Sequence, residues 1–247
     1  MRKKGFTLIE LLATSAILLV LVVVGGGAAW KVYESSSLAV SANNIRQLAA
    51  GGVQYLADND HGFWPYRGAD SAGVTWWFGF ESLASQARGE GSRDFNAELG
   101  PLAGYIPKGA RPDPSFALRG KVFKPKFRNG YIGTGYNVLL GGGFSGRGAC
   151  ANFWKLSDPS QVVVFFTSAQ VNTFQSPAST SNPMLEEFYG IDGREVTVHF
   201  RHNGKAMVSF ASGNAGFLEM DESTRDKRMP RANVGRFAPV GDTRYLQ

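Results

Sequence analysis

A single carboxylate interrupts a long uncharged stretch near the start of the chain. Glu10 is the only charged residue between Gly5 and Trp30. An ionisable group within an apolar helix costs up to about 2.5 to 3.5 kcal/mol at the centre of a bilayer, and such groups are usually functional. Phe6 lies one helical turn before Glu10, on the same helix face. The isolated carboxylate therefore indicates a functional residue.

The histidines and acidic residues give no catalytic or metal-binding pattern. His199 and His202 are an odd number of positions apart, so on one strand they would face opposite sides and could not share a metal. Asp58 and Asp60 could bind calcium weakly, but their loop lacks the other ligands of a calcium site, and we prefer solvated carboxylates at a helix end. We therefore expect neither a cofactor nor an enzymatic activity.

A glycine-rich segment at residues 141–146, with the sequence GGGFSG, formally matches the dinucleotide-binding pattern GxGxxG. That pattern works only when a helix follows, because the pyrophosphate binds at the N-terminus of the helix. No helix of adequate length is expected before Asp158 and Pro159. The sequence therefore does not predict a dinucleotide site.

A group of aromatic residues could form a sugar-binding platform, although such residues more often belong to a core. They are Phe63, Trp64, Tyr66, Trp76, Trp77, Phe78 and Trp154. We expect most of them to be buried.

The segment that carries Glu10 is long enough to cross a membrane. Residues 11–29 are almost entirely apolar, and about 20 such residues span a bilayer as a helix. Basic residues precede the segment, so we expect a transmembrane helix over residues 6–30 with Met1 in the cytoplasm and the later residues outside. Two alternatives are an uncleaved signal anchor and a secretory signal cut after Ala29, which would leave Trp30 as the mature N-terminus.

Residues 3–11, with the sequence KKGFTLIEL, resemble the processing site of type IV prepilins and type II secretion pseudopilins. The resemblance implies that residues 1–5 are a leader cut between Gly5 and Phe6, and that Phe6 is then N-methylated. It also implies that Glu10 is the carboxylate used in subunit assembly.

A second resemblance lies near the C-terminus. His202, followed after nine residues by Ser212 and Gly213, is similar to the H-X9-DG element of a large pseudopilin-like family, with Ser212 in place of the aspartate. Similar pieces of that family are found at residues 44–48, 55–65, 135–141 and 158–166. The resemblance thus extends over most of the chain.

The elements beyond the membrane segment predict an α+β fold. Apolar residues recur at helical spacing from Ser41 to Ala57, so we expect the helix to continue over residues 31–58 and to pack its apolar stripe on a globular head. Residues 59–220 form that β-rich head in our interpretation. The predicted strands are Val74–Phe80, Val162–Thr167, Val196–Arg201, Ala206–Ala211 and Ala215–Met220.

The last three of these strands are expected to form an antiparallel meander. Asn203 and Gly204 favour a type I′ turn between the first two, and residues 212–214 favour a second turn. A mainly antiparallel sheet packed on the second half of a long N-terminal helix is the pilin-like architecture that the resemblance implies.

Residues 221–247 contain six basic and four acidic residues with little periodicity. We expect an extended surface tail or an inter-subunit arm there. The interleaved acids weaken any attraction to nucleic acid. The net charge of the whole chain is +6, and loss of the three basic leader residues would lower it to +3, so we expect no specific nucleic-acid partner.

Together these features predict a structural subunit of a type II secretion pseudopilus or type IV pilus-like filament. The implied partners are a prepilin peptidase that also methylates, an assembly platform with its ATPase, further copies or other pseudopilins, and membrane lipid. The implied location is the inner membrane, with the head extracytoplasmic, and then the filament. The alternative is an exported carbohydrate- or ligand-binding protein with a disposable signal peptide.

Overall fold

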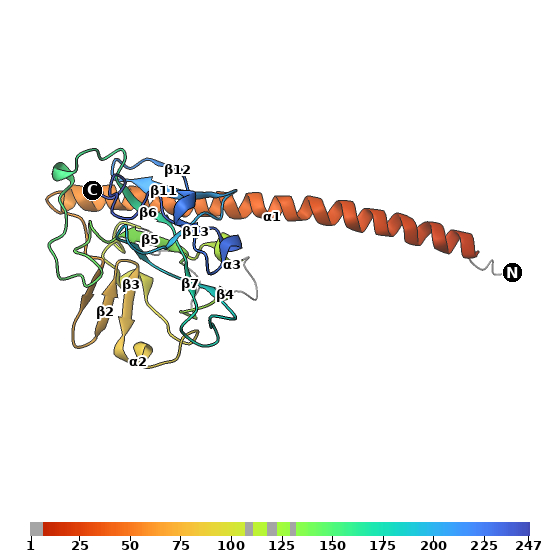
Figure 1. Cartoon of the computed structure of the whole chain (residues 1–247), viewed down its shortest axis with the longest axis horizontal. Coiled ribbons are helices and arrows are strands. Elements are labelled where there is room, and N and C mark those ends of the chain that lie inside the picture. The colour runs from red at the N-terminus through yellow and green to blue at the C-terminus, as the bar shows by residue number, and fades with distance from the viewer. Residues whose placement is uncertain (1–6, 107–110, 118–122, 129–131) are drawn as a thin grey trace. The chain divides into compact units, whose positions relative to one another are not determined.

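The computed structural model describes residues 7–106, 111–117, 123–128 and 132–247, except for the side chains of residues 24–31 and 34. The chain divides into two compact units, Met1–Ala39 and Val40–Gln247. Helix α1, Leu8–Asp58, begins close to the predicted position and ends at the predicted residue (red to orange in Figure 1). The fold is α+β, with sheets that are mostly antiparallel, as the sequence predicts.

The end of α1 is set by two residues with left-handed backbone. Asp60 has φ 50° and His61 has φ 59°, and the His61 N–H donates to the carbonyl of Leu56 at 2.9 Å. This bond, from the second residue beyond the cap to the third-last helical position, is typical of a Schellman ending. The polar turn that the sequence places here therefore stops the helix by backbone geometry.

Within the second unit, one face of α1 is buried in the head. Ile45, Leu48 and Leu56 are buried as predicted, whereas Val53 of the predicted stripe is 44% exposed. A Cβ at Gly52 would lie 2.9 Å from Cη2 of Trp64, so the glycine permits the Trp64 ring to approach the helix backbone. Trp64 in turn stacks on Tyr136 and Phe165, with ring centroids 5.0 and 5.5 Å away.

The largest sheet has five strands in the order β12-β11-β6-β5-β9. All neighbours are antiparallel except β5 and β9, which are parallel. The strand bounds are β12 Ala215–Glu219, β11 Lys205–Phe210, β6 Val163–Thr167, β5 Thr134–Asn137 and β9 Gly190–Ile191. β6 is buried at every residue, in agreement with its continuous apolar sequence.

The predicted three-stranded meander is wrong in its first strand. Asn203 and Gly204 do form a two-residue turn with φ 52° and 78°, and the turn before β12 is also present. However, the strand before the turn is only β10, Val198–His199, and it pairs with β13, Val234–Gly235. The antiparallel neighbours of β11 are β12 and β6.

The reason lies in the burial of both faces of residues 196–201. The alternation of apolar and polar residues predicts one face in water, but Thr197, His199 and Arg201 are as buried as Val198 and Phe200. The C-terminal segment covers this strand and provides its partner β13. A polar face therefore does not identify a solvent face here.

The predicted strand Val74–Phe80 is instead a hairpin. β2, Gly73–Trp76, and β3, Gly79–Ser82, are antiparallel, with Trp76 opposite Gly79. The turn between them is formed by Trp77 and Phe78, which are both buried. The apolar run that suggested one strand is therefore divided by a turn whose side chains lie in the core. β1, Arg67–Ala69, completes this sheet, which lies apart from β11 and β12 (Figure 1).

The remaining elements are short. A further sheet has the order β4-β8-β7, with β4 parallel and β7 antiparallel to β8. Its strands are β4 Phe123–Lys124, β7 Gln170–Asn172 and β8 Met184–Glu186. The described short helices are α2 Leu83–Gln86, η1 Ala97–Leu99, α3 Pro114–Ala117, η3 Phe153–Lys155, η4 Glu222–Thr224 and η5 Pro230–Ala232.

The C-terminal segment 221–247 is folded into the head, so the prediction of an extended tail is wrong. Phe237 and Leu246 are buried in one apolar cluster of the described head, and Val234 is buried in another. The Val163 N–H in β6 donates to the carbonyl of Tyr245 at 2.8 Å. The segment lacks periodicity because it contributes isolated anchoring residues separated by turns.

Candidate processing and assembly site

The first residues of α1 form a capping box around the predicted assembly carboxylate. Glu10 Oε2 accepts from the Thr7 backbone N–H at 2.8 Å and from the Thr7 hydroxyl at 2.9 Å. The Glu10 N–H donates to Thr7 Oγ1 at 3.3 Å. Because the two residues satisfy each other's free groups, they stabilise the start of the helix. The pattern T-x-x-E at residues 7–10 is the sequence signal of this local role, which was not among the predictions above.

The surroundings of Glu10 are apolar and open. Every described side chain from Thr7 to Val23 is exposed, and most of them are large aliphatic groups. Glu10 is the only charged residue among them. The carboxylate is therefore accessible, and the described side chains around it are apolar or carry hydroxyl groups.

The predicted cleavage and methylation residues, Gly5 and Phe6, lie outside the described residues. The side chains of residues 24–30, in the second half of the predicted membrane segment, are also outside them. Within the part of the chain whose side chains are described, no helix has both the length and the apolar character needed to cross a membrane.

The histidine and acidic positions weighed in the sequence are not brought together. The His199 ring packs edge-on against Phe116 and its Nδ1 lies 3.2 Å from Nη1 of Arg201. His202 pairs through its backbone with Lys205 at the two-residue turn. Asp58 and Asp60 are exposed at the end of α1. In the described ranges, no group of three or more His, Cys, Asp or Glu side chains could hold a metal ion.

The glycine-rich segment 141–146 forms turns. Gly142, Gly143 and Gly146 have positive φ, and the next helical element is the single turn η3. The described segment therefore has turns where a dinucleotide-binding pattern would need a following helix.

The seven aromatic residues considered as a sugar-binding platform belong mostly to the core, as expected from the sequence. Five of the seven are buried, Trp76 is half-buried and Trp154 is exposed. The buried five are Phe63, Trp64, Tyr66, Trp77 and Phe78. These rings do not form a surface platform.

Some of the basic residues of the C-terminal segment form ion pairs with acids close by in the sequence. Arg225 pairs with Glu222, and Arg228 pairs with Asp226, at 2.7 and 2.6 Å. Their charge is thereby offset locally, which weakens the attraction that these two residues exert on anions.

Sequence reasoning missed a buried carboxylate in the head. Glu187 is fully buried and accepts backbone N–H bonds from Lys126 and Ile132, both at 3.1 Å. Burial raises the pKa of Glu187 to about 7, although these N–H donors act in the opposite direction. No local pattern marks such a residue, because its partners come from a distant segment.

Comparison with known proteins adds one match. Residues 1–26 match the family described as "Prokaryotic N-terminal methylation motif". No curated protein and no solved structure matches the chain. The match includes the predicted leader, Phe6 and Glu10. The chain therefore carries the prokaryotic N-terminal methylation motif, which is consistent with a type IV pilin-like or pseudopilin-like protein.

Proposed function

We propose that this chain is a structural subunit of a type II secretion pseudopilus or a type IV pilus-like filament. In this proposal a prepilin peptidase cuts between Gly5 and Phe6 and the new N-terminal amine is methylated. Residues 6–30 then hold the subunit in the inner membrane with its head outside, until an assembly platform and its ATPase add it to the filament. Its role is structural and not catalytic.

The observation that carries the proposal is the position of Glu10 within the methylation motif. The carboxylate is exposed four residues after Phe6, in a helix whose other described side chains nearby are uncharged. In a bundle of such helices, the amine of one subunit and the carboxylate of its neighbour each lose water, and they compensate each other only when paired. That requirement would fix the register between subunits.

The carboxylate is already bonded to Thr7 of its own helix, so a variant has to separate the charge from the capping role. Glu10→Gln keeps a side-chain oxygen that can accept the Thr7 N–H, but it removes the charge. Glu10→Ala removes both. We expect both variants to insert and to be processed but not to enter filaments, as measured by membrane fractionation and filament shearing.

A matched control is Ser15→Ala, a nearby exposed position whose hydroxyl donates to the Leu12 carbonyl of its own helix. This variant should assemble normally. Assembly of Glu10→Gln at the wild-type level would contradict the charge-pairing role.

Sequencing of the mature N-terminus tests the processing step. N-methyl-Phe6 is expected. Trp30 at the N-terminus would instead favour an exported ligand-binding protein with a disposable signal, and an intact Met1 would favour a simple signal anchor.

A further inference from the structure

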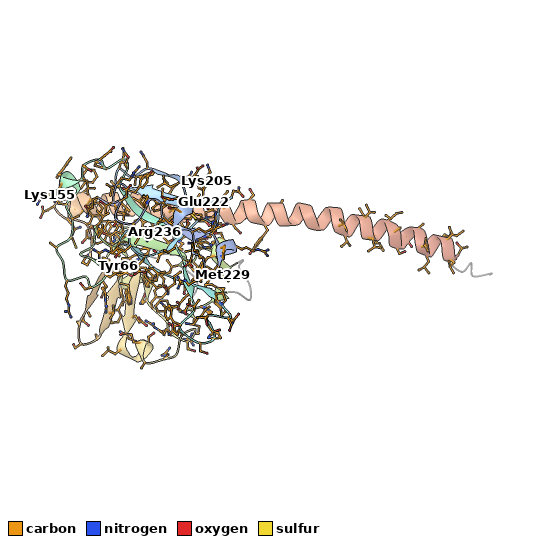
Figure 2. All side chains as sticks on the ribbon, in the orientation of Figure 1. Tyr66, Lys155, Lys205, Glu222, Met229 and Arg236 are labelled. Atoms are coloured by element: carbon orange, nitrogen blue, oxygen red, sulfur yellow. The ribbon has the colours of Figure 1, made fainter. Side chains whose placement is uncertain are left out.

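The head contains a cavity lined by aromatic and cationic side chains. Its volume is about 250 Å³. The aromatic lining consists of Tyr66, Trp76, Phe127, Phe144, Phe188 and Tyr189, and the cationic lining consists of Arg67, Arg93 and Lys126. Tyr66 lies among the side chains inside the head, whereas Lys155 and Lys205 lie at its periphery (Figure 2).

The aromatic walls restrict what the cavity can hold. Tyr66 meets Phe144 and Trp76 edge to face, with ring centroids 5.5 and 6.0 Å apart. These contacts brace the rings that line the space. The cavity is slightly smaller than the roughly 300 Å³ at which ordinary small-molecule sites begin. It therefore suits a single six-membered ring better than a chain of rings.

Two of the three cations are already matched by buried carboxylates. Arg93 makes a two-pronged bond to Glu81, with both N–O distances 2.7 Å, and Glu81 is fully buried. Lys126 Nζ lies 3.9 Å from a carboxylate oxygen of Glu186. These two cations therefore add little net attraction for an anion.

Arg67 differs from the other two cations. Its guanidinium carbon lies 5.0 Å from the ring centroid of Trp76, and among the described residues it takes part in no ion pair. None of the described residues that line the cavity is acidic. An anion in the cavity would thus meet one guanidinium whose charge is not balanced by a neighbour.

We propose that this cavity binds a carboxylate attached to one six-membered ring. The N–H fork of a guanidinium matches a carboxylate with two parallel hydrogen bonds, which assigns the carboxylate to Arg67. The ring of the ligand then lies against the aromatic walls, where either a sugar ring with an apolar face or an aromatic ring can pack. A uronic acid and an aromatic carboxylic acid are the two sources of this chemistry.

Ligand titrations of the full-length protein in detergent test the proposal. Glucuronate and benzoate are compared with their neutral counterparts, glucose and benzyl alcohol, and with inorganic phosphate. Calorimetry measures binding, and tryptophan fluorescence, to which Trp76 at the cavity contributes, gives a second readout. Saturable binding of glucuronate or benzoate, at least about tenfold tighter than its neutral counterpart, is expected from a charge-assisted bond. The tighter of the two acids identifies the source.

Two arginine variants locate the site. Arg67→Met keeps the aliphatic stem without the charge and should weaken binding of the acid by at least about tenfold. Arg147→Met, at an exposed position outside the cavity lining, should leave it unchanged. Circular dichroism of each variant checks that the head is folded.

Three results would overturn the proposal. These are the absence of saturable binding by both acids, equal binding of the acids and their neutral counterparts, and binding by Arg67→Met equal to wild type. Phosphate binding as tight as that of both acids would overturn the requirement for a ring. This binding test does not depend on the proposed role in filament assembly. The Glu10 variants test that role and alter no residue of the cavity, so either proposal can fail without the other.

Discussion

Arg201 and Asp113 form an ion pair in the interior of the head, with both side chains almost fully shielded from water. The other oxygen of Asp113 accepts the Ser41 hydroxyl of α1 at 2.6 Å and the Ser115 N–H at 2.9 Å. Burial raises the pKa of Asp113, but Arg201 and the serine hydroxyls outweigh it and hold the pKa below its usual value. The pair thus joins α1, α3 and the segment before the β11 turn.

Breaking this pair on one side is expected to be costly. Asp113→Asn should lower the free energy of unfolding by about 3 to 5 kcal/mol, because Arg201 stays buried without a counter-charge. The measurement is urea unfolding of the full-length protein in detergent. A control is Glu219→Gln, which removes the exposed pair with Lys205 and should change stability by about 1 kcal/mol or less.

The same pair predicts a loss of stability in acid. Because the folded-state pKa of Asp113 is depressed, its contribution is present above the unfolded pKa of about 3.9 and is lost as the pH falls through the folded value. Asp113→Asn should therefore flatten that part of the pH profile. A profile that falls as steeply in the variant as in wild type would contradict the assignment.

Glu187 predicts the opposite pH dependence. Its folded-state pKa is raised to about 7. Between about pH 4.5 and 7, Glu187 is therefore protonated in the folded protein and ionised in the unfolded chain. The Glu187 contribution is therefore present below about pH 4.5 and is lost as the pH rises to 7, by about 2 to 3 kcal/mol. Glu187→Gln should remove this decline in unfolding experiments at pH 5 and 7.5, while Glu98→Gln, at an exposed site, should not.

The close packing of Trp64 on Gly52 leaves little room for a larger residue at this position of α1. A methyl group there would lie 2.9 Å from the Trp64 ring, which is itself stacked on two others. Overpacking costs typically about 1 to 3 kcal/mol, and the better helix propensity of alanine offsets up to about 1 kcal/mol of it. We expect Gly52→Ala to lower the unfolding midpoint. Ala50→Leu, on the exposed face of α1, should leave the midpoint almost unchanged.

Leu246 tests whether the C-terminal segment is part of the core. Its side chain is 3% exposed, and its carbonyl accepts from Nδ2 of Asn137 at 3.0 Å. Leu246→Ala should destabilise the head by about 2 to 5 kcal/mol. Val240→Ala, at a site that is 66% exposed, should change stability by about 0.5 kcal/mol or less. Equal stability of both variants would favour an extended tail.

The elements that the sequence identifies correctly are those specified by local patterns. The helix end at Asp58 follows from turn-forming residues, and β11 and β12 follow from their spacing around a turn. The assembly role of Glu10 stays a prediction, and it too depends on the residues within one helical turn.

The elements that the sequence misses depend on distant partners. β10 pairs with β13, which lies more than thirty residues later, so the alternation in residues 196–201 could not reveal its burial. The cavity also depends on residues that are distant in the sequence, since Arg67, Arg93 and Lys126 come from three separate segments. The Trp77 and Phe78 turn was missed because a buried turn contains none of the usual polar turn residues.

The packing of residues 237–246 against β6 has a consequence for the order of events during synthesis. A chain emerges from its N-terminus, so α1 and the first strands are available while the Phe237 and Leu246 side chains have yet to be made. β6 can complete its apolar cluster only once those side chains arrive. The head therefore completes this apolar cluster only after residues 237–246 have been translated.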